Sequence, residues 1–242
     1  MCNACPSPES QTIKSRRHFF KLAAAGFALS ALPSAWSAEK FIPKPENNLS
    51  PDAALNRLMA GNARYVSQQS INTSFSATRE ALTRGQNPYA CILSCADSRV
   101  GPELCFDSER GDLFVTRVAG NYVTPQILAS LEYGTAVLNS PLIMVLGHTS
   151  CGAIKATIDA VTKNTDYPGH IQTLTTDLSP AIRAALKNKP SNAEDACTRE
   201  NIRFNVERLQ QANPLLSERV QSGRLKVVGG LYDLSSGRVT LV

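Results

Sequence analysis

Four apolar runs along the chain predict the strands of a buried sheet. Each run is continuous rather than alternating, which is typical of strands covered on both faces, as in a parallel sheet. Segments with a helical pattern separate the runs, so strand and helix alternate and the fold class is α/β, with a mostly parallel central sheet flanked by helices. The predicted strands lie at 89–94, 112–117, 141–147 and 224–232, and the helical segments at 125–139, 151–163, 169–188 and 192–221.

The segment before the first strand is predicted to form an N-terminal helical arm. Ser50 is a good N-cap, Pro51 suits the first turn and Asp52 lies near the positive end of the helix dipole. An apolar stripe continues this helix to about residue 69, and a second short helix is expected over 76–84. The chain ends in SSGRVTLV, which reads as a turn and a last strand, antiparallel at an edge of the sheet. The apolar stripe of the first helix consists of Leu55, Leu58, Met59 and Val66. We expect one domain, over 50–242.

Residues 1–37 have the layout of an export signal rather than of a folded element. A basic stretch, SRRHFFK, precedes an apolar run of 11 residues and then small residues suited to cleavage. That run is shorter than the roughly 20 apolar residues that span a bilayer. The pair Arg16 and Arg17 resembles a twin-arginine signal. We therefore expect delivery to the periplasm by the twin-arginine export machinery, no stable membrane anchor, and a linker over 38–49. An uncleaved amphipathic helix or an anchor is the alternative.

Composition and charge narrow the class of partner. The chain is 43% hydrophobic and 19% charged, as expected for a globular domain. Its net charge is +5, but residues 1–37 hold four basic residues and one acidic residue, which leaves about +2 for the remainder. A near-neutral body lacks the clustered basic face that nucleic-acid binding requires, so no nucleic-acid partner is expected.

The cysteines do not form a fully paired disulfide framework. Cys2 and Cys5 precede the arginine pair and would be lost with the signal, and the five that remain are an odd number. In an oxidising compartment a free thiol needs protection, either by burial or by metal coordination. Cys91 and Cys105 read as buried side chains, whereas Cys197, at the polar start of a helix, reads as free or half-exposed.

Candidate chemistry gathers where two of the predicted strands end. The first strand leads into Cys95, Asp97 and Arg99, and the third leads into His148 and Cys151. Sites in open α/β sheets form at the carboxyl ends of the strands, so both clusters should reach one edge. Two cysteines and a histidine are zinc ligands, and three protein ligands with an open position make a catalytic site. A buried hydrophobic role for each cysteine is the simpler alternative, since the spacing H-x-x-C alone is weak.

The position of Cys151 adds to the metal hypothesis. It is expected at a helix N-terminus, where the dipole favours the thiolate. The backbone N–H of Gly152, in the first turn, could then hold an anionic oxygen of the substrate beside the metal. The chain has only three histidines, and His18 lies in the signal while His170 lies in a polar turn, so His148 is the candidate ligand.

Three sequence motifs, taken in their order along the chain, resemble those of β-class carbonic anhydrases. The resemblance runs through most of 50–242 and includes LNRLMAGNARYV near the start of the domain. The stretch GPELCFDSERGD lacks the glutamine that many members of the family have there. The motifs are CADSR at 95–99, GDLFVTRVAGN at 111–121 and GHTSCGA at 147–153.

This resemblance implies an activity and a set of roles. One Zn²⁺ per chain would be held by Cys95, His148 and Cys151, and CO₂ would be reversibly hydrated to bicarbonate and a proton by attack of a zinc-bound hydroxide. Asp97 and Arg99 would be the catalytic pair. In some members the aspartate is a fourth zinc ligand at rest, and in active forms it pairs with the arginine. A homodimer or homotetramer is also implied.

Two alternatives stay open at this point. An enzyme on the same scaffold could hydrolyse CS₂ or COS, with the same zinc ligands. A zinc-binding protein without catalytic activity is the other, although a purely structural site would favour four protein ligands.

Overall fold

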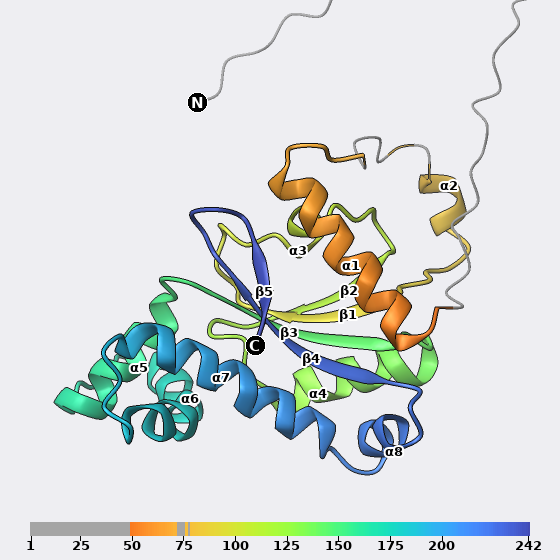
Figure 1. The fold of residues 1–242 in the computed structure, drawn as a ribbon. Helices are drawn as coiled ribbons and strands as arrows, with labels where there is room; N and C mark the ends of the chain where they lie inside the picture. Colours follow the sequence, from red (N-terminus) through yellow and green to blue (C-terminus); the bar gives the residue numbers. More distant parts are fainter. Residues whose placement is uncertain (1–48, 72–75, 77) are drawn as a thin grey trace, which may run out of the picture. The chain divides into compact units, whose positions relative to one another are not determined.

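The computed structural model describes residues 49–71, 76 and 78–242 (Figure 1). The predicted export signal, with Arg16 and Arg17, lies outside the described residues, as does the linker up to residue 48. No helix in the described part of the chain is long and apolar enough to cross a membrane.

The core of the fold is a five-stranded sheet in the order β2-β1-β3-β4-β5. The first four strands run parallel, and β5 pairs antiparallel with β4. The α/β class, the mostly parallel sheet and the antiparallel last strand are therefore confirmed. The strands are β1 (Ala90–Ser94), β2 (Leu113–Arg117), β3 (Leu142–His148), β4 (Lys226–Tyr232) and β5 (Val239–Leu241).

Helices cover both faces of this sheet (Figure 1). On one face lie α1 (Pro51–Val66) and α3 (Pro102–Cys105), and on the other lie α4 (Pro125–Glu132), α7 (Ala193–Gln210) and α8 (Leu215–Gln221). Because successive strand residues point to opposite faces, each central strand contributes to both layers. Ile92 packs in the cluster that includes Leu58 of α1, and its neighbour Leu93 packs with Ile202 of α7.

The predicted N-terminal helix forms and packs on the sheet of its own chain. The Ser50 hydroxyl accepts a hydrogen bond from the Ala53 amide at 3.2 Å, which caps the helix as expected. Leu58 is fully buried against the sheet. Whether this helix also contacts a second copy of the chain stays a prediction.

A third layer of helices extends the fold beyond the carboxyl end of β3. It consists of α5 (Gly152–Lys163) and α6 (Ile171–Leu186), which pack on each other and on α7. Cys197, on α7, packs against these helices and is fully buried, so the prediction that it is half-exposed was wrong. The start of α7 is polar on its outer side, but the face that carries this thiol packs against α6.

The structure changes several predicted helix boundaries. The segment 192–221 is two helices, because Pro214 cannot continue the ladder of α7 and instead precedes α8. The segment 125–139 continues past α4 as a π-helical turn, Tyr133–Val137. The second short helix, α2, is limited to Arg79–Leu82, and α3 was not predicted.

Candidate metal centre

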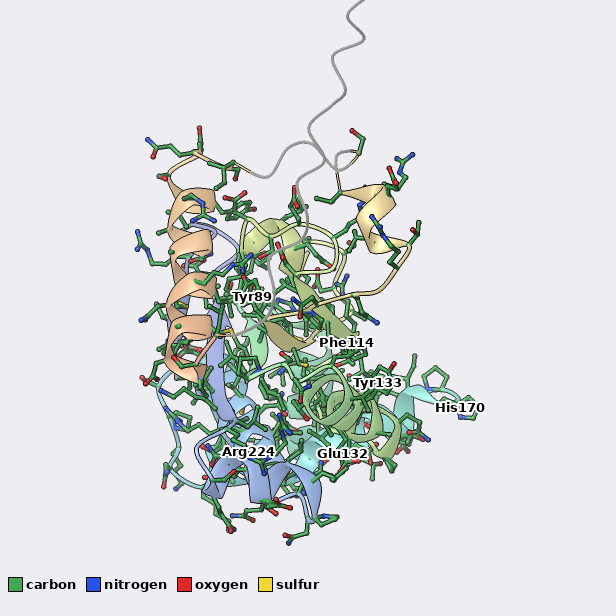
Figure 2. The ribbon with its side chains drawn as sticks, turned by 90° about the vertical axis from the view of Figure 1, so that its right-hand side faces the viewer. Tyr89, Phe114, Glu132, Tyr133, His170 and Arg224 are labelled. Carbon is green, nitrogen blue, oxygen red and sulfur yellow. The ribbon has the colours of Figure 1, made fainter. Side chains whose placement is uncertain are left out.

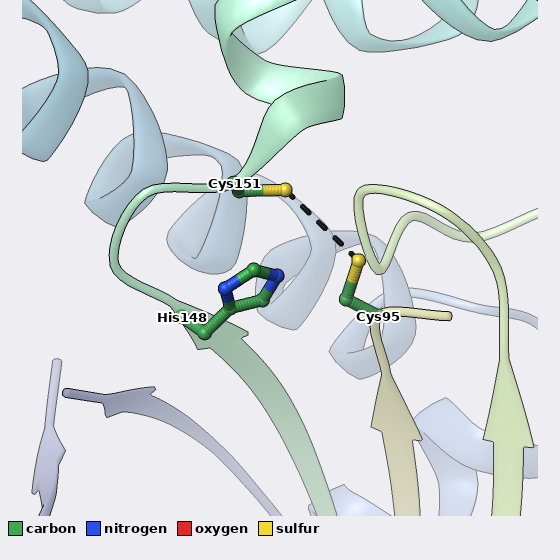
Figure 3. Close-up of side chains that lie close together, drawn as sticks. All are labelled: Cys95, His148 and Cys151. Atoms are coloured by element: carbon green, nitrogen blue, oxygen red, sulfur yellow. Dashed lines mark hydrogen bonds between the residues drawn. The ribbon is translucent and has the colours of Figure 1, made fainter. Parts of the chain in front are cut away.

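Two adjacent parallel strands deliver the predicted ligands to one point. Cys95 directly follows β1, and His148 is the last residue of β3, which pairs with β1. Cys151 is the N-cap of α5, three residues further on. Figure 3 shows the three side chains facing one another, and one ligand atom from each lies within 4.8 Å of the others. All three residues are buried. The predicted convergence of the two strand ends is therefore confirmed.

The His148 ring is held in the tautomer that a metal ligand needs. Its Nδ1 lies 2.9 Å from the backbone carbonyl oxygen of Thr149. A carbonyl only accepts, so Nδ1 carries the proton and Nε2 has a free lone pair. Nε2 is buried and has no hydrogen-bond partner among the described residues. A buried acceptor without a partner is costly, and a cation at the centre of the three side chains would satisfy it.

The two thiols form a strongly interacting pair. Their sulfurs lie 4.0 Å apart, and the backbone N–H of Gly120 donates to the Cys95 sulfur at 3.3 Å. The hydrogen bond with Cys151 lowers the pKa of the Cys95 thiol, and the same contact raises the pKa of Cys151. One thiolate therefore forms readily, and a divalent metal would displace the second proton.

The donor set fits zinc. One imidazole nitrogen and two thiolates are the ligands of this borderline-soft ion, and they leave one of four tetrahedral positions to a non-protein group. The Cys95, His148 and Cys151 group could thus hold one zinc ion per chain with an open position for chemistry.

Asp97 lies at the edge of this group and is paired with Arg99. The guanidinium donates to both carboxylate oxygens, Nε to Oδ1 at 2.9 Å and Nη2 to Oδ2 at 2.7 Å, and the Arg99 amide also donates to Oδ1 at 2.9 Å. These hydrogen bonds hold the pKa of Asp97 well below its usual range. Asp97 Oδ2 is 3.8 Å from His148 Nε2. The structure thus shows the paired arrangement, in which Asp97 borders the metal site without joining the three donors.

Arg99 also links the two ligand loops. Its Nη2 donates to the Ser150 carbonyl at 3.3 Å. Ser150 has a positive φ of 56°, an uncommon conformation for a residue with a side chain. This turn brings its carbonyl within reach of Arg99 and leads directly into Cys151. Gly152, which begins α5, is exposed, and its proposed contact with an anionic oxygen stays a prediction.

Arg117 is a residue of the site that the sequence reasoning missed. It is the last residue of β2, and its guanidinium donates to the carbonyls of Cys95 (2.9 Å), Asp97 (2.7 Å) and Val100 (2.8 Å). It therefore fixes the whole loop that carries Cys95, Asp97 and Arg99. Its position at the end of a strand next to β1 is the signal that could have revealed it.

Comparisons with known proteins agree with this site. A family model described as carbonic anhydrase matches residues 90–239. The chain is 37% identical over 195 residues to the carbonic anhydrase of Mycolicibacterium smegmatis, across 80% of this chain and 94% of that protein. The same values hold for carbonic anhydrase 2 of Mycobacterium tuberculosis. The solved structure of the β-carbonic anhydrase CcaA has 30% sequence identity and a TM-score of 0.63, covering 77% of this chain and 86% of that one.

These matches span the residues that build the metal centre, from Cys95 to Cys151. The fold, the donor set and the relatives agree, and the chain belongs to the β-class carbonic anhydrases.

Proposed function

We propose that this chain is a zinc enzyme that reversibly hydrates CO₂ to bicarbonate and a proton. The observation that carries the proposal is the buried Cys95, His148 and Cys151 group, bordered by an aspartate that an arginine keeps ionised. The relatives named as carbonic anhydrases support the reaction. Zinc, when bound, supplies the Lewis-acid chemistry that makes water a nucleophile near neutral pH, an effect established for carbonic anhydrases.

The chain's own residues supply the orientation and a hydrogen-bond acceptor. Asp97 is ionised because Arg99 donates to both of its oxygens, so a carboxylate is available beside the three donors. That carboxylate can accept a hydrogen bond from the reacting water and orient it toward CO₂. Arg99 holds the carboxylate in place and keeps it from joining the donors. The N–H of Gly152 lies at the positive end of α5, where it would bind an anionic oxygen of bicarbonate.

Stopped-flow CO₂ hydration by the zinc-loaded protein tests this function. We expect strong acceleration by the wild-type protein and none after Cys95→Ser, with zinc content measured in both samples. Stoichiometric zinc without acceleration between about pH 7 and 9 would instead indicate a zinc-binding protein without this activity. Faster release of sulfide from CS₂ or COS than hydration of CO₂ would assign the alternative substrate.

We also propose that the chain is exported by the twin-arginine route to the periplasm. The support is the Arg16–Arg17 pair followed by a short apolar run. Export in the folded state would allow zinc to bind before transport. N-terminal sequencing of the mature protein checks this, because recovery of intact Met1 from the cytosol contradicts it. Replacement of both arginines by lysine should keep the protein in the cytoplasm.

Assembly as a homodimer or homotetramer is proposed as well. β2 is an edge strand of the sheet. Its residue Phe114 contacts Tyr133, with the two ring centroids 6.1 Å apart (Figure 2). Tyr133 is 47% exposed and Val137 is 60% exposed. Exposed apolar side chains beside a strand edge suit burial against a second copy. Sedimentation equilibrium measures the oligomeric state, and a monomer at micromolar concentration would contradict the proposal.

A further inference from the structure

Two asparagines on the inner face of α7 are buried beside the apolar side chains that pack on the sheet. Asn201 and Asn205 are each 1% exposed and lie one helical turn apart. Burying a side-chain amide costs free energy unless hydrogen bonds replace those that water made. Two such residues on the buried side of a helix therefore need a structural or functional reason.

The pair fixes the backbone of the loop at 120–123. Asn205 Oδ1 accepts from the Val123 amide at 2.8 Å, and its Nδ2 donates to the backbone carbonyl (2.8 Å) and to Oδ1 (3.0 Å) of Asn201. Asn201 Nδ2 then donates to the Gly120 carbonyl at 2.8 Å. Each asparagine orients the next, and together they hold both ends of the loop.

That loop acts directly on the metal centre. The N–H of Gly120, whose carbonyl Asn201 holds, donates to the Cys95 sulfur at 3.3 Å. Gly120 has φ +88°, and an added Cβ would lie 2.8 Å from Leu178 Cδ1, so its conformation requires glycine. Hydrogen bonds thus link Asn205 to Asn201 and Asn201 to the Gly120 carbonyl, and the backbone of Gly120 joins that carbonyl to the N–H that donates to Cys95.

The helix that carries the asparagines is closely packed on the sheet. A Cβ on Gly147 in β3 would lie 2.7 Å from Ile202 Cδ1, so α7 approaches this strand more closely than a larger residue would allow. Ile202 adjoins Asn201, and Gly147 adjoins the ligand His148. The same contact therefore places the asparagines relative to the strand end that carries His148.

An N–H hydrogen bond to a thiolate withdraws electron density from the sulfur. It also fixes the direction of the sulfur lone pairs and lowers the sulfur's donor strength toward a bound metal. This matters here because two thiolates already neutralise the charge of a divalent ion, which weakens its action as a Lewis acid. A hydrogen bond on one thiolate counteracts that weakening.

We propose that Asn201 and Asn205 are positioning residues of the metal centre, which hold the Gly120 amide on the Cys95 sulfur and so set the donor strength of that ligand. The inference rests on the metal centre of the proposed function. It adds a role for α7, whose two asparagines lie 50 and 54 residues after Cys151, and this role does not depend on the reaction catalysed.

Cobalt substitution tests the role through the sulfur-to-metal charge-transfer absorption. Loss of the hydrogen bond makes the sulfur easier to oxidise, so Asn201→Ala and Asn205→Ala should move this band to lower energy. An unmoved band in both folded variants would overturn the proposal.

Asn62→Ala is the matched control. Asn62 is also buried, and it donates to the Cys105 and Gly237 carbonyls and accepts from the Val239 amide. None of these partners lies in a ligand loop. This variant should lose thermal stability as Asn201→Ala does, yet keep the wild-type band. A band that moves equally in the control would show a general effect of destabilisation and would overturn the proposal.

A measurement on the wild-type protein needs no variant to fold. In protein loaded with ¹¹³Cd, the Gly120 amide proton should show a scalar coupling to the metal across the N–H···S hydrogen bond. An absent coupling refutes the inference, whatever the enzyme activity. A coupling present in a protein without CO₂ hydration would refute the proposed function and leave the inference standing.

Discussion

The Arg117 Nε donates a hydrogen bond to the backbone carbonyl of Cys95 at 2.9 Å. An arginine at the end of β2 thus holds the main chain of a candidate metal ligand that directly follows β1. Its Nη2 continues along the same loop to the carbonyls of Asp97 and Val100. Cys95 and the Asp97 carboxylate share one loop, so a single guanidinium sets the position of both.

Replacement of Arg117 should lower the hydration rate without removing the chemical groups of the site. In Arg117→Ala the loop loses three hydrogen bonds, and a displacement of about 1 Å costs roughly 100-fold in rate. Because Arg117 is exposed, added guanidinium should restore part of the activity. Arg117→Lys should recover little, since an ammonium group lacks the planar fork. An alanine variant with the wild-type kcat would contradict the prediction.

Asp97→Asn should separate metal binding from catalysis. The amide keeps the size of the side chain but cannot act as an anionic acceptor, so we expect full zinc occupancy and a fall in kcat of about 100-fold or more. Zinc content by atomic absorption and stopped-flow hydration measure the two effects. Unchanged turnover would remove Asp97 from the mechanism, and loss of zinc would show that it is needed to hold the metal.

Removal of zinc should make Cys95, one of the five cysteines of the domain, reactive toward alkylation. The lowered pKa of the Cys95 thiol makes it nucleophilic once the metal is gone, whereas the same contact raises the pKa of Cys151 and keeps that thiol protonated. Burial raises the pKa of Cys91 to about 12 and that of Cys197 to about 11, so at pH 8 both stay protonated and unreactive. Burial also raises the pKa of Cys105.

Peptide mass spectrometry after treatment with iodoacetamide measures this pattern. The zinc-loaded protein should stay unmodified, and the chelator-treated protein should be modified first at Cys95. Rapid labelling of Cys91 in both samples would show that the apolar layer around β1 opens more often than its burial indicates.

The ligands could be predicted from the sequence because each is tied to a local signal. Cys95 directly follows one apolar run that forms a strand, and His148 is the last residue of another. In a parallel sheet the carboxyl ends of such strands lie at the same edge. Asp97 and Arg99 lie in the same short loop, so their pairing needs little long-range information.

The supporting residues could not be predicted in this way. Arg117 and Asn201 act on backbone carbonyls, and a carbonyl is present at every position of the sequence. Only the three-dimensional arrangement shows which one is in reach. The burial of Cys197 was missed for a related reason, because the polar residues around it face outward on α7 while the thiol faces α6.

Leu58→Ala should destabilise the chain itself, because α1 belongs to the core of its own domain. Leu58 is fully buried and packs in the cluster that contains Ile92 and Met144. Loss of such a side chain lowers the free energy of unfolding by about 2–5 kcal/mol. Leu104→Ala is the matched control, since Leu104 is 64% exposed and its loss should cost within about 0.5 kcal/mol. Urea unfolding at several protein concentrations measures both. A loss for Leu58→Ala that vanishes on dilution would show that the helix stabilises mainly a neighbouring copy, as the predicted arm would.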